Sequence, residues 1–414
     1  MTRDPEDRPK LRHVEAVPVM VQGRQAVGLK DPLMLTEQML VIDQGAVPLV
    51  AMFDGRHSLR DIQLEMTRQT GSIVFLDQIR SVVDGLEKAF LLEGDCFREA
   101  FERKVADYRK NPFRPSSHAG ASYSADPELL RRELEGFFTN SNGPGAPEFG
   151  TDNRRPLGLI APHIDIRSGG PCFASAYHAL ASGPPSDLYV ILGTGHAGVE
   201  RMFTATTLDF QTPLGIVNTD REFLDALSRE LGRDAAAEEI LHATEHVIEF
   251  QVIFLQYLFR DRHPFKIVPI LCSLSHNIFR NQEDLKDEAS VFHDFCAALK
   301  EVCRRSSRSV CFVASADLDH IGPRYGDAFT PGQATISQTI EDDRKLLSAL
   351  ERLDVNEFVE RVALDNDSKR ICGFSPITTM LHCMEASEGR LLGLDYAKVD
   401  DKNSFVSFTS MIFH

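Results

Sequence analysis

The stretch "LGLIAPHIDIRSGG", residues 157–170, begins like a buried β-strand and ends in polar residues. Its apolar run stops at Pro162, and His163, Asp165 and Arg167 follow at once. In open α/β sheets, ligands bind beyond the carboxyl ends of the strands. The stretch therefore predicts a core strand that delivers side chains to a site at one edge of a sheet.

The sequence after residue 156 alternates short apolar runs with longer segments of helical periodicity. Four of the runs predict strands: "LGLIA" (157–161), "DLYVILG" (187–193), "FKIVPILC" (265–272) and "SVCFVAS" (309–315). Nearly continuous apolar strands that alternate with helices are typical of a sheet covered on both faces. We therefore predict an α/β fold for this part of the chain.

The other three predicted strands end on reactive or turn residues as well. They are His196 in "GTGHAG", the pair Cys272 and Ser273, and Asp317, Asp319 and His320 in "ADLDHIG". A single histidine after a strand is usually an ordinary loop residue, but histidines at three strand ends of one sheet favour a shared site. The glycines around His196 would let the backbone approach a ligand closely, or would serve a tight turn.

A later segment, "HATEHVIEFQ", places His246 and Glu249 three residues apart in the sequence. On a helix, this spacing puts both side chains on one face. Such a pair suits metal binding or a supporting hydrogen bond to a ligand residue. The alternative is a solvent-exposed helical stripe that Glu245 would join.

Cys372 stands apart from the other seven cysteines, which lie mostly in apolar runs. In "RICGFSPITTM" it precedes a predicted helix that Ser375 would cap. A helix N-terminus lowers the pKa of a thiol, and Lys369 and Arg370 are close in the sequence. We therefore expect Cys372 to form a thiolate readily.

The N-terminal residues 1–105 predict a small, mainly helical domain of winged-helix size, followed by a linker over 106–113. Ser58 can cap one helix, and a second helix, in "LDQIRSVVDGLEKAFLLEG", has apolar residues at spacings of three and four, with Gly94 as its stop. This pattern resembles the PqqD-like domains that bind leader peptides in peptide-modifying systems. A packing or dimerisation domain is the alternative.

The overall composition limits the classes of function. The 414 residues suffice for two domains, with 43% hydrophobic and 26% charged residues and a net charge of −16. Such an acidic chain would repel nucleic acid and anionic lipid. The charged start "MTRDPEDRPK" predicts no secretory signal, and no apolar run approaches membrane-span length. Eight cysteines without CxxC spacing indicate reduced thiols, so we expect a cytoplasmic protein.

Residues 114–414 resemble the Memo family, also called AmmeMemoRadiSam system protein B where it accompanies a radical-SAM enzyme. The matching motifs occur in the family's order: "SSHAGASYSADPELLRRELEGFF", "APHIDIRSGG", "LGTGH", "DFQTPLG", "EHVIEF", "IVPILC", "SADLDHIG" and "ICGFSPI". Ordered motifs over about 70% of the chain are far more specific than any one of them. The resemblance implies a sheet like that of class III extradiol dioxygenases, covered by helices, with a metal pocket at its edge. It also implies radical-SAM and AMMECR-type partner proteins.

The resemblance assigns roles to individual residues. His163 and His196 correspond to the family's two histidine ligands, and Cys372 corresponds to a cysteine that stands where related dioxygenases place a carboxylate. His320 matches a general-base position of the dioxygenase relatives. His246 and Glu249 match the family's His-x-x-Glu helix, and we expect them to share the catalytic work.

Two imidazoles and one thiolate would form a three-ligand site with open positions. Such a set suits iron or copper, and zinc is a third candidate. The sequence therefore predicts a metal-dependent redox protein, with oxygenase chemistry as one form of it. The alternative is a non-catalytic module that holds a metal or a peptide, in which the N-terminal domain recruits a peptide or a partner protein.

Overall fold

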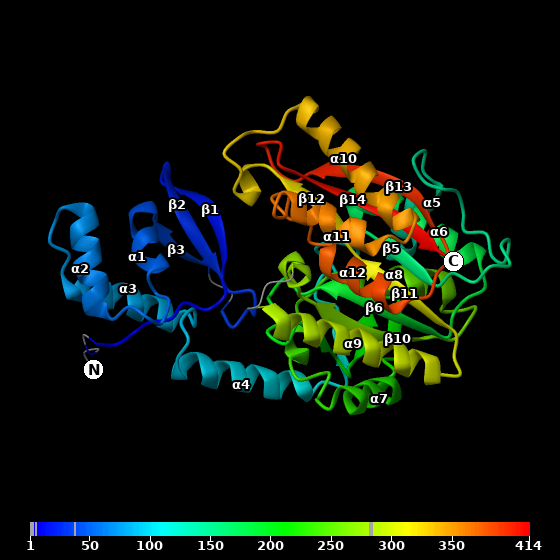
Figure 1. Cartoon of the computed structure of the whole chain (residues 1–414), viewed down its shortest axis with the longest axis horizontal. Helices are drawn as coiled ribbons and strands as arrows, with labels where there is room; N and C mark the ends of the chain where they lie inside the picture. Colours follow the sequence, from blue (N-terminus) through cyan, green and yellow to red (C-terminus); the bar gives the residue numbers. More distant parts are fainter. Residues whose placement is uncertain (1–3, 5, 37–38, 281–284) are drawn as a thin grey trace. The chain divides into compact units, whose positions relative to one another are not determined.

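Figure 1 shows the computed structural model of the chain, which describes residues 4, 6–36, 39–280 and 285–414. The chain forms two compact units, Met1–Asn111 and Pro112–His414. Each unit has its own hydrophobic core. No helix among the described residues is long and apolar enough to cross a membrane.

The described residues of the N-terminal unit form a small sheet, four α-helices and one short 3-10 helix, drawn in blue to cyan in Figure 1. Its strands pair antiparallel in the order β1-β2-β3. The elements are β1 (Glu15–Val21), β2 (Arg24–Lys30), β3 (Leu40–Asp43), the short helices η1 (Gln44–Ala46) and α1 (Val47–Ala51), α2 (Leu59–Thr70), α3 (Leu76–Lys88) and α4 (Asp95–Arg109). The prediction of a mainly helical unit therefore missed the sheet.

The hairpin was missed because β1 is largely exposed and lacks a clear apolar alternation. Its two-residue turn is made by Gln22 and Gly23, which both have positive φ angles of 50° and 77°. Two central residues of positive φ match the right-handed twist of paired strands. Gly23 provides this conformation without a Cβ penalty.

The helices of this unit begin and end partly as predicted. Ser58 caps α2, since its hydroxyl accepts from the Asp61 amide at 3.2 Å, and α3 buries one apolar face. The predicted stop at Gly94 was wrong, because α3 ends at Lys88 and Gly94 precedes α4. Because α4 runs to Arg109, the first residues of the predicted linker 106–113 are helical.

The C-terminal unit is built on a mixed sheet of eight strands, which brings the four predicted strands together. β5 (Gly158–Ala161), β11 (Val310–Ser315), β6 (Leu188–Thr194) and β10 (Lys266–Cys272) are adjacent and parallel. The sequence did not predict the antiparallel strands at the two edges, which are β7 (Phe203–Ala205), β12 (Asp317–Ile321), β13 (Gly389–Lys398) and β14 (Phe405–Phe413). A separate small sheet contains β4 (Phe113–Arg114), β8 (Asp209–Thr212) and β9 (Gly215–Val217).

Helices cover both faces of the large sheet, as predicted. On one face lie α5 (Pro127–Thr139), α6 (Ile166–Ser182) and α8 (Val247–Phe259). On the other lie α7 (Arg221–Leu231), α9 (Lys286–Arg305), α10 (Gln333–Glu351), α11 (Val355–Leu364) and α12 (Phe374–Cys383). Short 3-10 helices η2 (Glu239–His242), η3 (His276–Phe279) and η5 (Pro323–Tyr325) lie in the connections. Burial on both faces explains why the central strands are apolar throughout.

The separate cores predict that the two units fold independently. Fragments 1–111 and 112–414 should each be soluble and unfold cooperatively on heating, because neither core is divided by the cut. Circular dichroism and size-exclusion chromatography measure this. Aggregation of both fragments would show instead that the units depend on each other.

Candidate metal centre

The carboxyl ends of the parallel strands bring the predicted histidines to one edge of the sheet. His163 lies two residues beyond β5, and His196 lies two residues beyond β6. Between these strands runs β11, after which Asp317 opens β12. The Asp317 carboxylate accepts from the His163 backbone amide at 2.9 Å, which ties two strand ends together.

Cys372 reaches this edge because its segment runs beside β12. The Gly373 amide donates to the Asp317 carbonyl at 2.9 Å, and the Thr194 hydroxyl donates to the Cys372 carbonyl at 2.7 Å. A Cβ on Gly373 would lie 2.4 Å from the Asp317 carbonyl oxygen, so glycine is required for this approach. The predicted helix follows, but its N-cap is Gly373, and the Ser375 hydroxyl instead bonds the backbone of Leu274.

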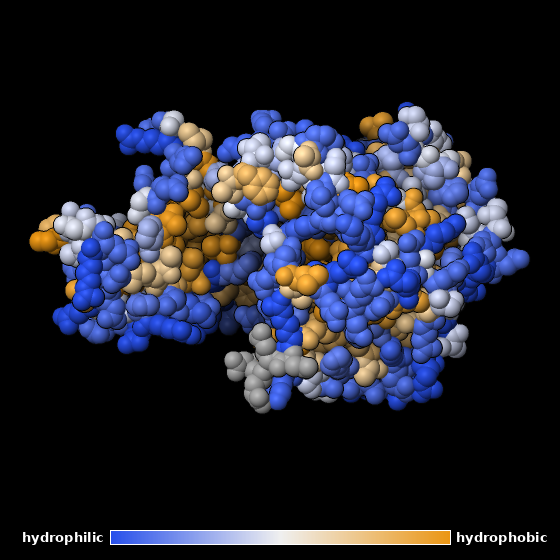
Figure 2. All heavy atoms as spheres, turned by 45° about the horizontal axis from the view of Figure 1, so that its top comes forward, coloured by the Kyte–Doolittle hydropathy of each residue, from blue (hydrophilic) through white to orange (hydrophobic). Residues whose placement is uncertain are grey.

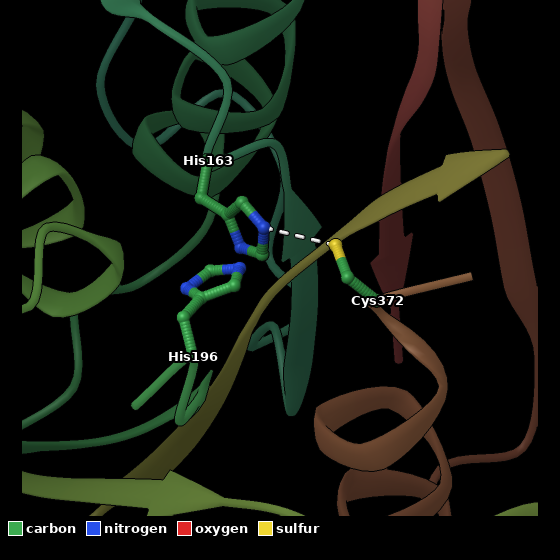
Figure 3. Close-up of side chains that lie close together, drawn as sticks. All are labelled: His163, His196 and Cys372. Carbon is green, nitrogen blue, oxygen red and sulfur yellow. Dashed lines mark hydrogen bonds between the residues drawn. The ribbon is translucent and has the colours of Figure 1, made fainter. Parts of the chain in front are cut away.

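The three residues that resemble ligands converge in the structure (Figure 3). His163 Nε2 lies 3.1 Å from Cys372 Sγ, and one donor atom from each of His163, His196 and Cys372 lies within 4.8 Å of the others. The His163 and His196 rings are 5.3 Å apart and nearly perpendicular. The side chain of His163 is only 3% exposed, whereas that of His196 is 42% exposed, so solvent reaches the cluster from the His196 side.

Each imidazole is held through its Nδ1 atom. His163 Nδ1 lies 3.0 Å from the Ser315 carbonyl oxygen. Because a carbonyl only accepts, the His163 proton is on Nδ1 and the lone pair is on Nε2, which faces Cys372. His196 Nδ1 lies 3.1 Å from a Glu245 carboxylate oxygen. Hydrogen bonds of this kind orient histidines as metal ligands and leave the other ring nitrogen for the metal.

Glu245 is the residue that the sequence analysis missed. From the sequence it was placed only in the alternative, a solvent-exposed helical stripe, but Glu245 is 8% exposed. Its carboxylate lies 3.1 Å from Nδ1 of both His196 and His246 and accepts from both backbone amides at 3.0 Å. Together with the two histidines it forms a second group of potential metal donors. The only sequence signal was its position directly before His246.

His246 and Glu249, which the sequence predicted as a pair, have different surroundings in the structure. His246 is the N-cap residue of α8, and its ring lies 5.3 Å from the His196 ring and 5.6 Å from the His163 ring. Glu249, one turn later, belongs to neither group of potential metal donors among the described residues. His246 therefore borders the centre, whereas Glu249 faces another part of the unit.

The Glu249 carboxylate is occupied by a buried network. It accepts hydrogen bonds from the side chains of Arg114 and Tyr123 and, at 3.0 Å, from the backbone amides of Ser117 and His118. Burial raises the pKa of Glu249, but Arg114 and Tyr123 outweigh it and lower the pKa below its usual value. The structure thus gives Glu249 a role in fastening β4 and the following segment to the start of α8. The catalytic role predicted for it stays a prediction.

His320 lies beside the Cys372 segment. Its backbone amide donates to the Lys369 carbonyl at 2.7 Å, and its ring stacks edge-on to Tyr325 at 4.9 Å. Nδ1 lies 2.9 Å from the Leu318 carbonyl, so Nε2 carries the lone pair. Burial lowers the pKa of His320 to about 4. His320 is therefore neutral near pH 7 and belongs to neither donor group within the described ranges.

The pKa of the Cys372 thiol is shifted in the direction opposite to the one that the sequence predicted. Burial raises the pKa of the Cys372 thiol, and a hydrogen bond from His196 offsets this only in part. Lys369 pairs with Asp319 at 3.0 Å and Arg370 pairs with Asp327 at 2.7 Å, so neither cation is committed to the thiol. The prediction of a readily formed thiolate was therefore wrong for the metal-free protein.

The pKa values of His163 and His196 are shifted in opposite directions. Burial, together with His196 and His246, holds the pKa of His163 well below its usual range, which favours the neutral, metal-binding form. Partial removal of the His196 ring from solvent lowers its pKa, but the Glu245 carboxylate and Cys372 outweigh this and raise the pKa well above its usual range. A metal would thus replace protons at His196 and Cys372.

The remaining predicted strand-end residues have other surroundings. Asp165 caps α6 by accepting from the Arg167 amide at 2.9 Å. Cys272 is fully buried in the core, and Asp319 is buried beside Lys369. The strand ends therefore supply structural residues as well as the donor groups.

Comparison with known proteins identifies the family of the C-terminal unit. The family model for Memo-like proteins matches residues 114–412. The chain belongs to the Memo family. A MEMO1 family protein of Methanopyrus kandleri is 34% identical over 66% of this chain and 88% of its own. One of Methanosarcina barkeri is 29% identical over 71% of this chain and 97% of its own.

The N-terminal unit lies outside the Memo match. A MEMO1 family protein of Aquifex aeolicus is nevertheless 26% identical over 98% of this chain and all of its own length. That alignment includes the N-terminal unit, so the Aquifex protein is similar to this Memo family member in both units. The relation of this unit to PqqD-like domains stays a prediction.

The buried network of Glu249 predicts a structural effect of its removal. Glu249→Gln should lower the free energy of unfolding by roughly 3 kcal/mol, because it leaves the Arg114 charge buried without a counter-ion. Urea unfolding measures the loss, with Glu360→Gln on the exposed surface of α11 as the control. Unchanged stability together with loss of metal would instead place Glu249 in the centre.

Proposed function

We propose that this Memo family protein is a metal-dependent redox protein that holds one iron or copper ion with His163, His196 and Cys372. The observation that supports this most directly is the convergence of their donor atoms within 4.8 Å. The Nδ1 partners, Ser315 and Glu245, give both imidazoles the orientation that metal ligands need.

The donor set bears on the choice of metal. Imidazoles suit iron, copper and zinc, and a thiolate favours softer ions such as copper. A bound iron or copper would supply Lewis acidity and one-electron redox chemistry, with dioxygen as one candidate co-substrate. Three protein ligands leave positions free, and the exposure of His196 gives access to them.

The chain's own residues around the centre suit proton transfer. His320 Nε2 is neutral and has its lone pair free, because Nδ1 is held by Leu318. His246 stacks on His196 and shares the Glu245 carboxylate. We assign His320 the role of general base, and His246 that of a group that holds or moves a proton beside the ligands.

A second function is favoured by the N-terminal unit. Its edge strand β1 exposes Met20 (65%) and Val21 (43%), and β3 exposes Val41 (42%). Figure 2 shows apolar side chains, in orange, gathered over part of this unit. An exposed strand edge can pair with an extended peptide. In this second proposal the chain is a binding module that recruits a peptide, or a radical-SAM or AMMECR-type partner, without turnover of its own.

The ligand assignment predicts the metal content of two variants. His163→Ala should lose most of the iron or copper found in the wild-type protein, because two remaining ligands bind a metal far more weakly. His320→Ala is the matched control and should keep the metal while losing dioxygen uptake with ascorbate as reductant. Elemental analysis after anaerobic purification measures the first effect, and full occupancy in His163→Ala would refute the assignment. Tight peptide binding without dioxygen uptake would favour the binding module.

The raised pKa of Cys372 predicts how its thiol reacts. In metal-free protein, alkylation at Cys372 should be slow at pH 7 and rise about tenfold per pH unit, because the thiolate is the reactive form. Metal should protect the thiol, and Cys372→Ser should lose copper more than iron, whereas Cys372→Asp should favour iron. Peptide mapping with and without metal tests this, with exposed Cys96 as the internal control. Equal labelling of Cys372 in both states would show that its sulfur does not bind the metal.

A further inference from the structure

Beside Cys372 opens a cleft that has no part in the ligand assignment. It has a volume of about 650 Å³, which is within the range of small-molecule sites. Thr194 and Cys372 form part of its wall, whereas His163 and His196 do not. The cleft thus meets the candidate metal centre only at the thiol and at the end of β6.

One buried side chain in this cleft lacks a partner. His276, at the start of η3, is 6% exposed, and its Nε2 atom has no hydrogen-bond partner among the described residues. Its ring packs edge-on against Phe374 at 6.3 Å, which fixes its position in the wall. A buried ring nitrogen without a partner is costly unless a ligand or a water completes it.

The charged groups of the cleft are all carboxylates. Glu200, Glu288 and Asp367 line it, and no lysine or arginine is among its described lining residues. Nearby arginines are engaged elsewhere, since Arg280 donates to Asn366 at 3.2 Å and Arg370 pairs with Asp327. The lining therefore favours a ligand with positive charge and N–H donors.

The backbone at Asp367 supports a ligand-binding role. Asn366 and Asp367 both have positive φ angles, 59° and 52°, which non-glycine residues seldom adopt. The Asp367 carboxylate accepts from the Ile371 amide at 2.9 Å, so the strained turn is fixed to the segment that carries Cys372. Strain of this kind concentrates at ligand sites.

We propose that this cleft binds a primary ammonium group on an organic molecule. Asp367 supplies the counter-charge, the unpartnered Nε2 atom of His276 accepts an ammonium N–H, and the carbon skeleton packs on Val199, Met202 and Phe374. The role of this cleft as the substrate pocket of the metal centre rests on the proposed function. Binding of the ammonium group itself needs no metal.

Calorimetric titration of the full-length, metal-free protein with benzylamine, benzyl alcohol and benzoate tests the charge preference. Benzylamine should bind about tenfold more tightly than benzyl alcohol, and benzoate should bind most weakly. A lysine side chain is the other source of the same group, so Nα-acetyl-lysine amide is compared with its Nε-acetylated form. Selective binding of the free lysine amide indicates a peptide ligand, and selective binding of benzylamine alone indicates a small amine.

Two substitutions locate the binding. Asp367→Asn keeps the acceptor for the Ile371 amide and should weaken benzylamine binding about tenfold. Asp365→Asn removes the same charge two residues away, outside the cleft lining, and should have little effect. His276→Phe, which keeps an aromatic ring but removes Nε2, should weaken binding as well. Equal affinities for the three benzyl compounds, or equal effects of the two aspartate variants, would overturn the proposal. Because no metal is present, these results do not depend on the ligand assignment.

Discussion

The centre depends on one buried carboxylate, that of Glu245. Its oxygens lie within hydrogen-bond distance of two imidazole Nδ1 atoms and two backbone amides, those of His196 and His246. An ionised carboxylate is costly to bury without such partners. Because its partners come from the segment after β6 and from the start of α8, Glu245 holds a strand end and a helix start in one arrangement. The orientation of His196 toward Cys372 follows from this contact.

Close packing of α8 on the sheet makes that contact possible. Gly193 in β6 lies against α8, and a Cβ there would come within 2.3 Å of the Val247 side chain. The Gln251 amide donates to the Pro162 carbonyl at 2.7 Å and to the Ser315 hydroxyl at 2.8 Å, which ties β5 and β11 to the same helix. Arg114 completes the frame by donating to the Glu245 carbonyl at 2.6 Å and to the Glu249 carboxylate. One helix start thus aligns three strand ends.

The sequence predicted the parts of this arrangement that depend on burial. The four central strands are apolar on both faces, so their ends, and the histidines beyond them, could be located from the pattern. β14 was not predicted because buried serines and threonines interrupt its apolar residues. The N-terminal hairpin was not predicted because β1 is largely exposed.

Side-chain pairing could not be predicted from sequence. Glu245 has polar neighbours in the chain, and only the fold shows that both flanking histidines turn toward it. The pKa of Cys372 was expected to fall because of Lys369 and Arg370, but those cations pair with aspartates from other elements, and burial raises it. The direction of a charged side chain is set by long-range partners, which local spacing does not encode.

In the proposed centre, one metal ion is bound by the Cys372 sulfur and the imidazoles of His163 and His196. X-ray absorption spectroscopy at the metal edge of anaerobically purified protein tests it most directly, because sulfur and nitrogen scatter differently. We predict one sulfur and two imidazole nitrogens in the ligand shell, with the sulfur absent in Cys372→Ser. A shell of nitrogen and oxygen alone in the wild-type protein would contradict the account.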